Sequence, residues 1–445
     1  MRRQWSILII GILIPLALKG SPQGGQATVA SQDGVIEALV QTALEHNPGL
    51  RAERAKIQAL REVPSQSRAL PDPMADVEFM NLSVRHPNLK DAFGGDISVG
   101  ITQTLPYPGK RALAGKKAED EVAAEVARLK TMESEFRGQV IGAAYRYAMV
   151  RNLLAINDQT QEVLKATAQS AAAVYSSGEG SQSDVLLAQT ALTRTQAERK
   201  ELEKQQEITL AKLSSLLAGP PPDGSLEGLA LPEPGPICTL DDLLLALPDS
   251  SPGVLAAKAD VAVTEAQVEI ARKNFKPDFI VGGRYRWKDS TMGGGDYITA
   301  MAGISLPFFH RRDRYRPALQ EALFQRESAK YGIDDAVNSN RYALTEAYQT
   351  ALRSTRVYGL YKQGLLIQAR LAFQSALAAY SVGRVDFASV LIALTNLYSY
   401  EADAVMAQGD FQESLAKIET VIGHPLASDG SPAPQASSPA QEPNP

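Results

Sequence analysis

The sequence is poor in the side chains that form covalent cross-links and metal centres. Among its 445 residues there are one cysteine, Cys238, and four scattered histidines. A single cysteine excludes an internal disulfide framework and any cysteine-based zinc or iron–sulfur centre. Four isolated histidines disfavour a multi-histidine metal site, so we expect no resident metal and no cofactor.

Aromatic residues, positive charge and enzyme motifs are also scarce. Aromatic residues make up 6% of the chain, and the formal net charge of −5 disfavours extensive nucleic-acid binding. The sequence contains no G-x-S-x-G, P-loop, H-E-x-x-H or C-x-x-C motif, and we therefore do not expect an enzyme. What remains is a composition typical of long helices rich in alanine, leucine, glutamine and glutamate.

The N-terminus has the pattern of an export signal. Arg2 and Arg3 precede an apolar run over residues 7–18, and small residues near Ala30 offer cleavage sites. We predict a signal peptide over residues 1–30. An uncleaved anchor is the alternative, which the shortness of the apolar run disfavours. No later stretch of the sequence approaches a helical membrane span, so an exported chain of this kind is periplasmic, secreted or a β-barrel of an outer membrane.

The remainder of the chain repeats itself after about 204 residues. The shared positions include prolines and glycines, which helical low complexity does not place in register by chance. The repeat pairs residues 47–50 with 251–254, 72–73 with 276–277, 105–106 with 306–307, 175–187 with 380–392, and Gly219 with Gly423.

This repeat defines the domain organisation. We predict a first structural repeat over residues 31–219, a proline-rich connector over 220–237 and a second structural repeat over 238–423. Residues 424–445 are rich in serine, proline, alanine and glutamine, and we predict that they form a disordered tail.

Each half is predicted to be mainly helical. Long helical stretches cover residues 109–175 and 316–380, and at 1.5 Å per residue each spans about 100 Å. No globular core is that deep, so each stretch must pair lengthwise with other helices as a coiled coil does. Glycine turns at Gly178 and Gly383 then reverse the chain into antiparallel hairpins. The other predicted helices cover residues 35–63, 185–217, 254–275 and 387–422.

Two pairs of short extended segments interrupt the helices. In the third segment, apolar Val281 and Tyr285 alternate with Arg284, Arg286 and Lys288. This period of two predicts a strand with one apolar face and one charged face. The four predicted strands cover residues 75–86, 96–106, 278–288 and 296–307.

These strands have the length and the face pattern of tilted membrane-spanning strands. We expect the charged residues Asp96, Arg284, Arg286 and Lys288 to line a lumen, because a charge facing lipid at mid-membrane costs about 2–4 kcal/mol. Aromatic residues at the strand ends are expected to form a girdle at the membrane interface. This predicted girdle comprises Tyr107, Trp287, Tyr297, Phe308 and Phe309.

Four strands are too few to close a barrel in lipid. An open edge leaves unpaired backbone groups that each cost several kcal/mol, so several chains must complete one wall. Two copies would give eight strands with a filled interior, and three would give twelve with room for a channel. From the strand pattern alone, two hairpins covering helices of a soluble domain remain the alternative.

At this point the residues resemble the outer-membrane efflux protein family, the TolC-like channels. The resemblance covers about residues 31–423 and rests first on Tyr-x-x-Gly followed by Asp/Ser-Val-Leu, at residues 175–186 and 380–391. The Leu-Pro strand ends and the Asn-Pro of the first helix add to it. Residues 103–111 look like a pattern frequent in the heavy-metal-export branch of the family.

The resemblance implies a homotrimer in the outer membrane with most of its mass in the periplasm. Its mainly helical protomers would form a periplasmic tunnel from antiparallel hairpins, and each would give four strands to one 12-stranded transmembrane β-barrel. This passive duct would be gated at the helix tips and would meet a periplasmic adaptor protein and an inner-membrane pump. A soluble periplasmic coiled-coil adaptor or scaffold is the alternative, and a type I protein secretion duct is the alternative within the channel class.

The resemblance also implies gate and adaptor-contact residues at the tips. Family members with a well-described iris carry two carboxylates where this chain has Ser389 and Ile392. Asp184 or Asp386 could instead form a ring of three in a trimer, and helix N-capping is the alternative role for Asp184. Arg384 could pair with an acidic neighbour, contact the adaptor or be solvated. The predicted tip residues are Tyr175, Gly178, Asp184, Tyr380, Gly383, Arg384, Asp386 and Ser389.

Overall fold

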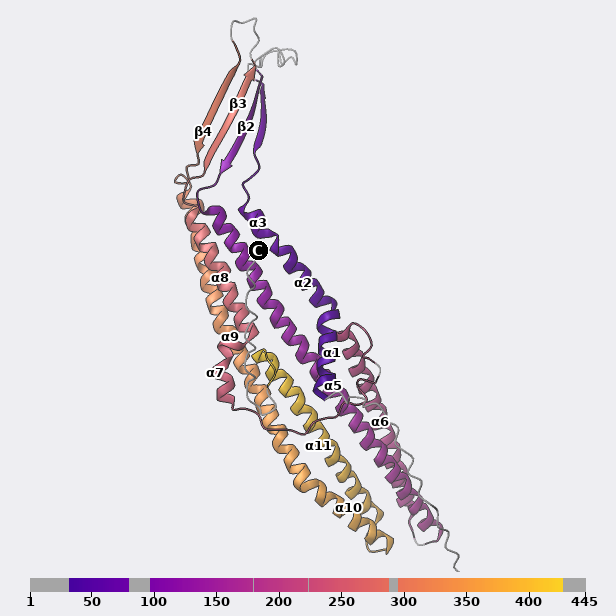
Figure 1. The fold of residues 1–445 in the computed structure, drawn as a ribbon. Coiled ribbons are helices and arrows are strands. Elements are labelled where there is room, and N and C mark those ends of the chain that lie inside the picture. The colour runs from indigo at the N-terminus through magenta and orange to yellow at the C-terminus, as the bar shows by residue number, and fades with distance from the viewer. Residues whose placement is uncertain (1–31, 80–96, 179, 223, 288–294, 427–445) are drawn as a thin grey trace, which may run out of the picture.

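The protein is an elongated, mainly helical molecule with a small sheet at one end (Figure 1). The computed structural model describes residues 32–79, 97–178, 180–222, 224–287 and 295–426. The predicted signal peptide, the predicted lumen residues Asp96 and Lys288, and the predicted tail beyond residue 426 lie outside the described residues.

The two halves of the chain have the same order of elements, as the sequence repeat predicts. Helices come first, two strands follow, and a very long helix and a returning helix complete each half. The first half contains α1 (Gln32–His46), α2 (Pro48–Arg61), α3 (Val63–Arg68), β1 (Met74–Phe79), β2 (Ile97–Leu105), α5 (Lys110–Ser176) and α6 (Gln182–Leu217). The second half contains α7 (Leu240–Ser250), α8 (Pro252–Lys273), β3 (Phe279–Trp287), β4 (Tyr297–Ile304), η2 (Arg311–Tyr315), α9 (Arg316–Leu360), η3 (Tyr361–Leu365), α10 (Leu366–Ser381) and α11 (Phe387–Ile422).

The predicted long helices are present, and they differ between the halves. Helix α5 runs for 67 residues without a break and is therefore about 100 Å long. Its counterpart starts as α9 and ends as α10, with the π-helical segment η3 between them. A single π-helical turn inside an otherwise α-helical stretch is a π-bulge, and the first long helix has none. None of the described helices combines the length and the hydropathy that a membrane span requires.

The first predicted helix, residues 35–63, is wrong as a single element. The chain breaks at Asn47, whose side chain accepts hydrogen bonds from the backbone N–H groups of Gly49 and Leu50 and so caps α2. Pro48 then occupies the first turn of α2, where its missing N–H group is not needed. The second repeat has the same break at Ser251-Pro252, and the preceding helix α7 was not predicted.

The hydrophobic core lies in the middle of the molecule and includes part of the connector. Leu226, Leu229 and Leu231 of the connector are buried against α1, α5 and α6. Arg151 of α5 holds this segment by donating hydrogen bonds to the carbonyl oxygens of Leu226 (2.7 Å) and Leu229 (2.5 Å). A second cluster joins α7, α8, α9 and α11. Each repeat therefore has its own core, and the proline-rich connector packs as part of the fold.

The four strands form one antiparallel sheet in the order β1-β2-β3-β4. Strands β2 and β3 join the two repeats, with a register that runs from Ile97 opposite Trp287 to Leu105 opposite Phe279. Strands β1 and β4 are the sheet edges, and neither has a second strand partner in the part of the chain that the structure describes.

Candidate functional site

The strand register divides the sheet into a polar face and an apolar face. Arg284 lies opposite Gly100, which lies opposite Asp76, and these residues belong to the polar face. One position along, Tyr285 lies opposite Val99, which lies opposite Val77, and these residues belong to the apolar face. The alternation predicted for β3 therefore extends across the whole sheet.

The polar face carries an ion bridge that spans three strands. Arg284 of β3 donates from Nη2 to Asp76 Oδ2 at 2.5 Å, and it also pairs through Nη1 with Glu78 Oε2. Both carboxylates stand on β1, so the guanidinium reaches across the intervening strand β2. Ser98 of β2 donates to Glu78 Oε2 at 3.4 Å. Asp76 and Glu78 are not among the predicted site residues, although they alternate with Val77 as the residues of a two-faced strand do.

The second predicted lumen arginine lies on the same face. Arg286 is opposite Ser98 and Tyr297 in the register. Its Nε atom is buried and has no hydrogen-bond partner among the described residues. The structure thus brings Arg284 and Arg286 together on one face, while Asp96 and Lys288 lie outside the described residues.

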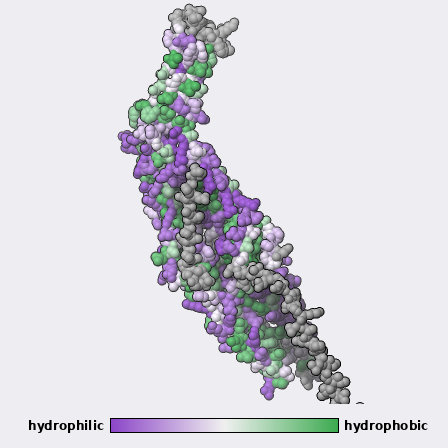
Figure 2. All heavy atoms as spheres, viewed as in Figure 1, coloured by the Kyte–Doolittle hydropathy of each residue, from purple (hydrophilic) through white to green (hydrophobic). Residues whose placement is uncertain are grey.

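The apolar face is exposed over most of its area. Ile298 of β4 is 83% exposed, Ile101 of β2 is 59% exposed and Val77 of β1 is 58% exposed. Figure 2 shows hydrophobic residues gathered over the strands, in contrast to the more hydrophilic helical segment next to them. Such a continuous exposed apolar surface marks contact with lipid or with another protein.

Most of the predicted girdle residues lie at the ends of the strands. Tyr107 stacks on Phe279 with a ring-centroid distance of 6.5 Å, and Trp287 meets Tyr285 edge-on at 4.7 Å. Phe308 and Phe309, which follow β4, contact each other at 4.4 Å and are largely exposed.

Tyr297 differs from the other members of the predicted girdle. It lies opposite Arg286, so its side chain belongs to the polar face and not to the apolar face. Its predicted place in the girdle rests on its position near a turn. The face of a strand residue depends on the register, which the turn does not reveal.

At the opposite end of the molecule, two helix tips lie at glycine turns. Gly178 and Gly383 have φ angles of +83° and +69°, which favour glycine. After the first turn, Ser181 caps α6 by accepting a hydrogen bond from the N–H group of Ser183. Asp184 is therefore in the first turn of α6 and is not the N-cap. Its negative charge there interacts favourably with the helix dipole.

In the second tip the capping residue is Asp386. Its Oδ1 atom accepts hydrogen bonds from the Ser389 backbone N–H (3.1 Å) and the Ser389 hydroxyl (2.5 Å). These hydrogen bonds hold the pKa of the Asp386 carboxyl below its usual range. The role that the sequence analysis considered for Asp184 thus belongs to Asp386, and Ser389 fixes that carboxylate in place.

The two tips pack on each other through a small apolar cluster. Phe387 is fully buried against Ala171 and Ala188 of the first hairpin, and it meets Tyr380 edge-on at 5.5 Å. Burial, and then the negative charge of Asp184, raise the pKa of the Tyr380 phenol.

The remaining tip residues are exposed. Tyr175, the counterpart of Tyr380, is 47% exposed. Arg384 is also exposed and forms no ion pair within the described residues. The two Tyr-x-x-Gly turns are therefore alike in backbone and different in packing.

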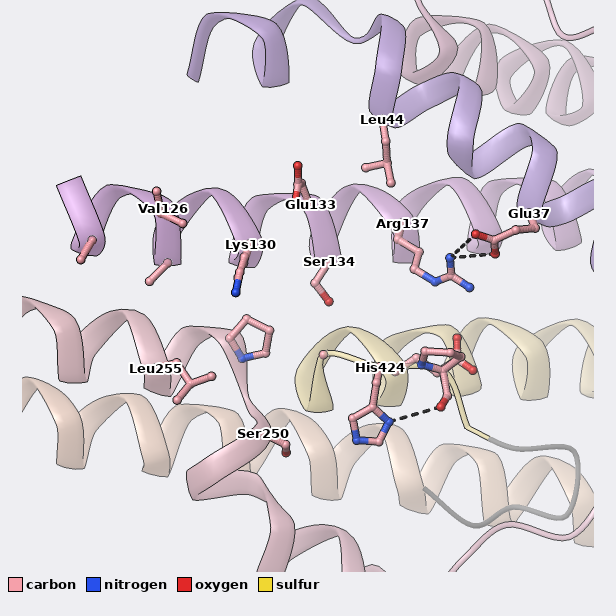
Figure 3. A pocket seen from close by; sticks show the side chains of 16 residues that line it. Glu37, Leu44, Val126, Lys130, Glu133, Ser134, Arg137, Ser250, Leu255 and His424 are labelled. Atoms are coloured by element: carbon pink, nitrogen blue, oxygen red, sulfur yellow. Dashed lines mark hydrogen bonds and ion pairs between the residues drawn. The ribbon is translucent and has the colours of Figure 1, made fainter. Parts of the chain in front are cut away.

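A cavity of about 690 Å³ lies between the two repeats (Figure 3). Its wall carries charges of both signs, including Glu37, Lys130 and Arg137, and it is also lined by His424. Arg137 and Glu37 pair with each other at 2.8 Å. We attribute this cavity to the packing of α5 against α8 and the end of α11.

Comparison with known proteins agrees with this architecture. Residues 39–219 and 244–424 match the family model described as outer membrane efflux protein. These two ranges correspond to the two structural repeats.

Individual relatives are similar along most of their length. Protein CyaE of Bordetella pertussis is 28% identical over 343 residues, which cover 72% of this chain and 69% of CyaE. The cobalt-zinc-cadmium resistance protein CzcC of Cupriavidus metallidurans is 23% identical over 400 residues, which cover 87% and 90%. A solved structure of the outer-membrane channel OprN superposes with a TM-score of 0.74 at 19% identity, covering 87% of this chain and 90% of that one.

Proposed function

Because this chain belongs to the outer membrane efflux protein family, we propose that it forms the outer-membrane exit duct of a tripartite efflux system. Family membership assigns it to the outer membrane and to transport. In the proposed system the duct is a passive pore, and an inner-membrane pump and a periplasmic adaptor protein supply energy and docking.

The observation that carries this proposal is the open four-stranded sheet with one apolar and one polar face. Its edges, β1 and β4, require partners if the sheet enters lipid, because unpaired backbone groups there cost several kcal/mol each. Strands alternate in direction, so β4 of one protomer would run antiparallel to β1 of the next. We propose that three protomers close a twelve-stranded barrel with the polar face inside.

Cysteine cross-linking tests this assembly. The natural Cys238 is first replaced by serine, and Val77→Cys on β1 is combined with Ile298→Cys on β4. If the edges meet, oxidation yields covalent dimers and trimers, with the trimer as the largest product. A stable monomer in detergent would contradict the assembly.

A matched pair of cysteines provides the control. Val99→Cys lies on the same apolar face but on the inner strand β2. It is therefore two strands from Ile298→Cys, about 10 Å away, in either direction around the proposed barrel. This exceeds the reach of a disulfide, so this pair should not cross-link.

We further propose that the helix tips gate the duct. Asp184 and Asp386 lie at the two tip turns, and in a trimer each would form a ring of three carboxylates. Asp184→Lys should change conductance and the closed fraction in planar bilayers. Asp386→Asn removes the charge and keeps the N-cap, so it separates gating from folding. Unchanged conductance and closure in both variants would contradict a gate at the tips.

For the cargo, we propose divalent metal cations. The relative CzcC is by name a cobalt-zinc-cadmium resistance protein. A strain that lacks this gene should become sensitive to cobalt, zinc or cadmium, and the wild-type gene should restore growth. Unchanged metal tolerance would contradict this cargo class and leave the duct itself unaffected.

A further inference from the structure

We propose that Gly100 lets Arg284 pair with two carboxylates of the other repeat, and that this ion bridge sets the charge selectivity of the membrane section of the duct. The inference rests on the proposed function, because it takes the polar face of the sheet as the lumen wall. It assigns a role in selectivity to Asp76, Glu78 and Gly100.

Arg284 of β3 and Asp76 of β1 lie on opposite sides of β2. Because adjacent strands lie about 4.8 Å apart, the backbones of these two residues are about 10 Å apart. The residue between them in the register is Gly100. The arginine side chain must therefore lie flat over Gly100 in order to reach Asp76 and Glu78.

The space above Gly100 is too small for a side chain. A Cβ atom at this position would lie 2.8 Å from Asp76 Oδ1 and 3.1 Å from Arg284 Nε. Any other residue would therefore press on both members of the bridge. Both contacts involve ends of flexible side chains, so a substitution would displace the bridge and leave the strand intact.

The charges on the wall of a pore influence which ions pass. Rings of arginine in a pore favour anions, and rings of carboxylates favour cations. Because Arg284 is shared between two carboxylates, its positive charge is compensated and does not oppose the passage of cations. Three copies around a pore would repeat this compensation at one level of the lumen.

Selectivity measurements on the full-length protein in planar bilayers test the consequence. Under a KCl gradient, Arg284→Gln should raise the K⁺/Cl⁻ permeability ratio by on the order of threefold, because it leaves two uncompensated carboxylates per protomer. The double variant Asp76→Asn/Glu78→Gln should lower the ratio by a similar factor. Channels that conduct with an unchanged ratio in both variants would overturn the selectivity role.

A thermal double-mutant cycle tests the role of Gly100 as a positioning residue. In the parent protein, the melting shifts caused by Arg284→Gln and by Asp76→Asn should be non-additive, because the two side chains interact. In a Gly100→Val background they should become additive. Gly283→Val is the matched control, since Gly283 lies on the apolar face and a Cβ there meets nothing within 4 Å.

The outcomes separate the two proposals. Additive shifts in the parent would overturn the assigned bridge. Coupling that survives Gly100→Val would overturn the role assigned to Gly100. Loss of coupling in Gly283→Val as well would overturn the specific role of Gly100. A complete absence of conductance from the wild-type protein would overturn the duct function and its selectivity, and the melting cycle would still decide whether the bridge exists.

Discussion

One buried carboxylate holds together three helices from both repeats, and neutralising it should loosen their junction. Glu125 of α5 has a side chain that is only 7% exposed, and it pairs with Lys56 of α2 and, at 2.8 Å, with Arg128 of α5. Arg128 also reaches Asp260 of α8, in the second repeat, at 2.5 Å. Glu125→Gln preserves the shape of the side chain and removes its charge, so it isolates the electrostatic contribution.

The size of the effect follows from the pKa. Hydrogen bonds that involve Glu53, Lys56 and Arg128 lower the pKa of Glu125 from 4.5 to about 2. A lowered pKa stabilises the fold at pH values above 4.5, and this stabilisation is lost as the pH falls towards 2. The shift alone would correspond to about 3 kcal/mol. Because Lys56 and Arg128 are more than half exposed and screened by water, we expect about 1–2 kcal/mol for Glu125→Gln at pH 7.

Native-state hydrogen exchange can measure this loss. Protection of α2 amides should fall roughly tenfold in Glu125→Gln at pH 7, since each 1.4 kcal/mol corresponds to a factor of ten. The difference from wild type should shrink as the pH is lowered from 4.5 towards 2. Glu162→Gln is the control, because Glu162 lies on the same helix in an exposed pair with Lys165. Equal protection in Glu125→Gln and Glu162→Gln, or a difference that does not depend on pH, would refute the reasoning.

Three further substitutions have defined outcomes. Phe387→Ala should destabilise the packing of the two tips by about 3–4 kcal/mol, because the ring is fully buried. Amide hydrogen exchange over residues 168–191 should therefore accelerate. Unchanged protection would show that the tips do not depend on this contact. Tyr380→Phe removes a buried hydroxyl with no hydrogen-bond partner in the described part of the chain. The free energy of unfolding should therefore stay the same or rise by less than about 1 kcal/mol. A fall in the melting temperature would contradict this. Burial raises the pKa of the Glu419 carboxyl, so the stability that this group contributes is present below pH 4.5 and is lost as the pH rises and the carboxyl ionises. Glu419→Gln can still accept the hydrogen bond from the Leu426 N–H, so its melting temperature should exceed that of the wild type at pH 7 and equal it at low pH. A lower melting temperature of Glu419→Gln at pH 7 would count against this.

Local sequence patterns predicted much of the fold. The glycine turns at Gly178 and Gly383 depend on backbone preference, and the long helices that end at these turns depend on helical periodicity; neighbouring residues encode both. The faces of β3 follow from the alternation of charged and aromatic residues over 284–287. The proline of Asn47-Pro48 also signalled a helix break, and the prediction overlooked it.

Long-range pairing was not predictable from the same patterns. The partners of Arg284 stand 206 and 208 positions away on β1, and their meeting depends on strand order and on a glycine in the strand between. The face of Tyr297 depends on register in the same way. At the tips, the choice of Ser181 over Asp184 as the N-cap depends on where the first helical turn begins, which the sequence leaves open by a few residues.

The unfinished sheet also has a consequence for biogenesis. Each repeat has its own helical core, whereas the strands carry an exposed apolar face and two edges without a strand partner among the described residues. A single protomer with a fully formed sheet would be prone to aggregation in water. We therefore expect the helices to fold first and the strands to order last, when they insert into the membrane. Chaperones should be needed most between these two events.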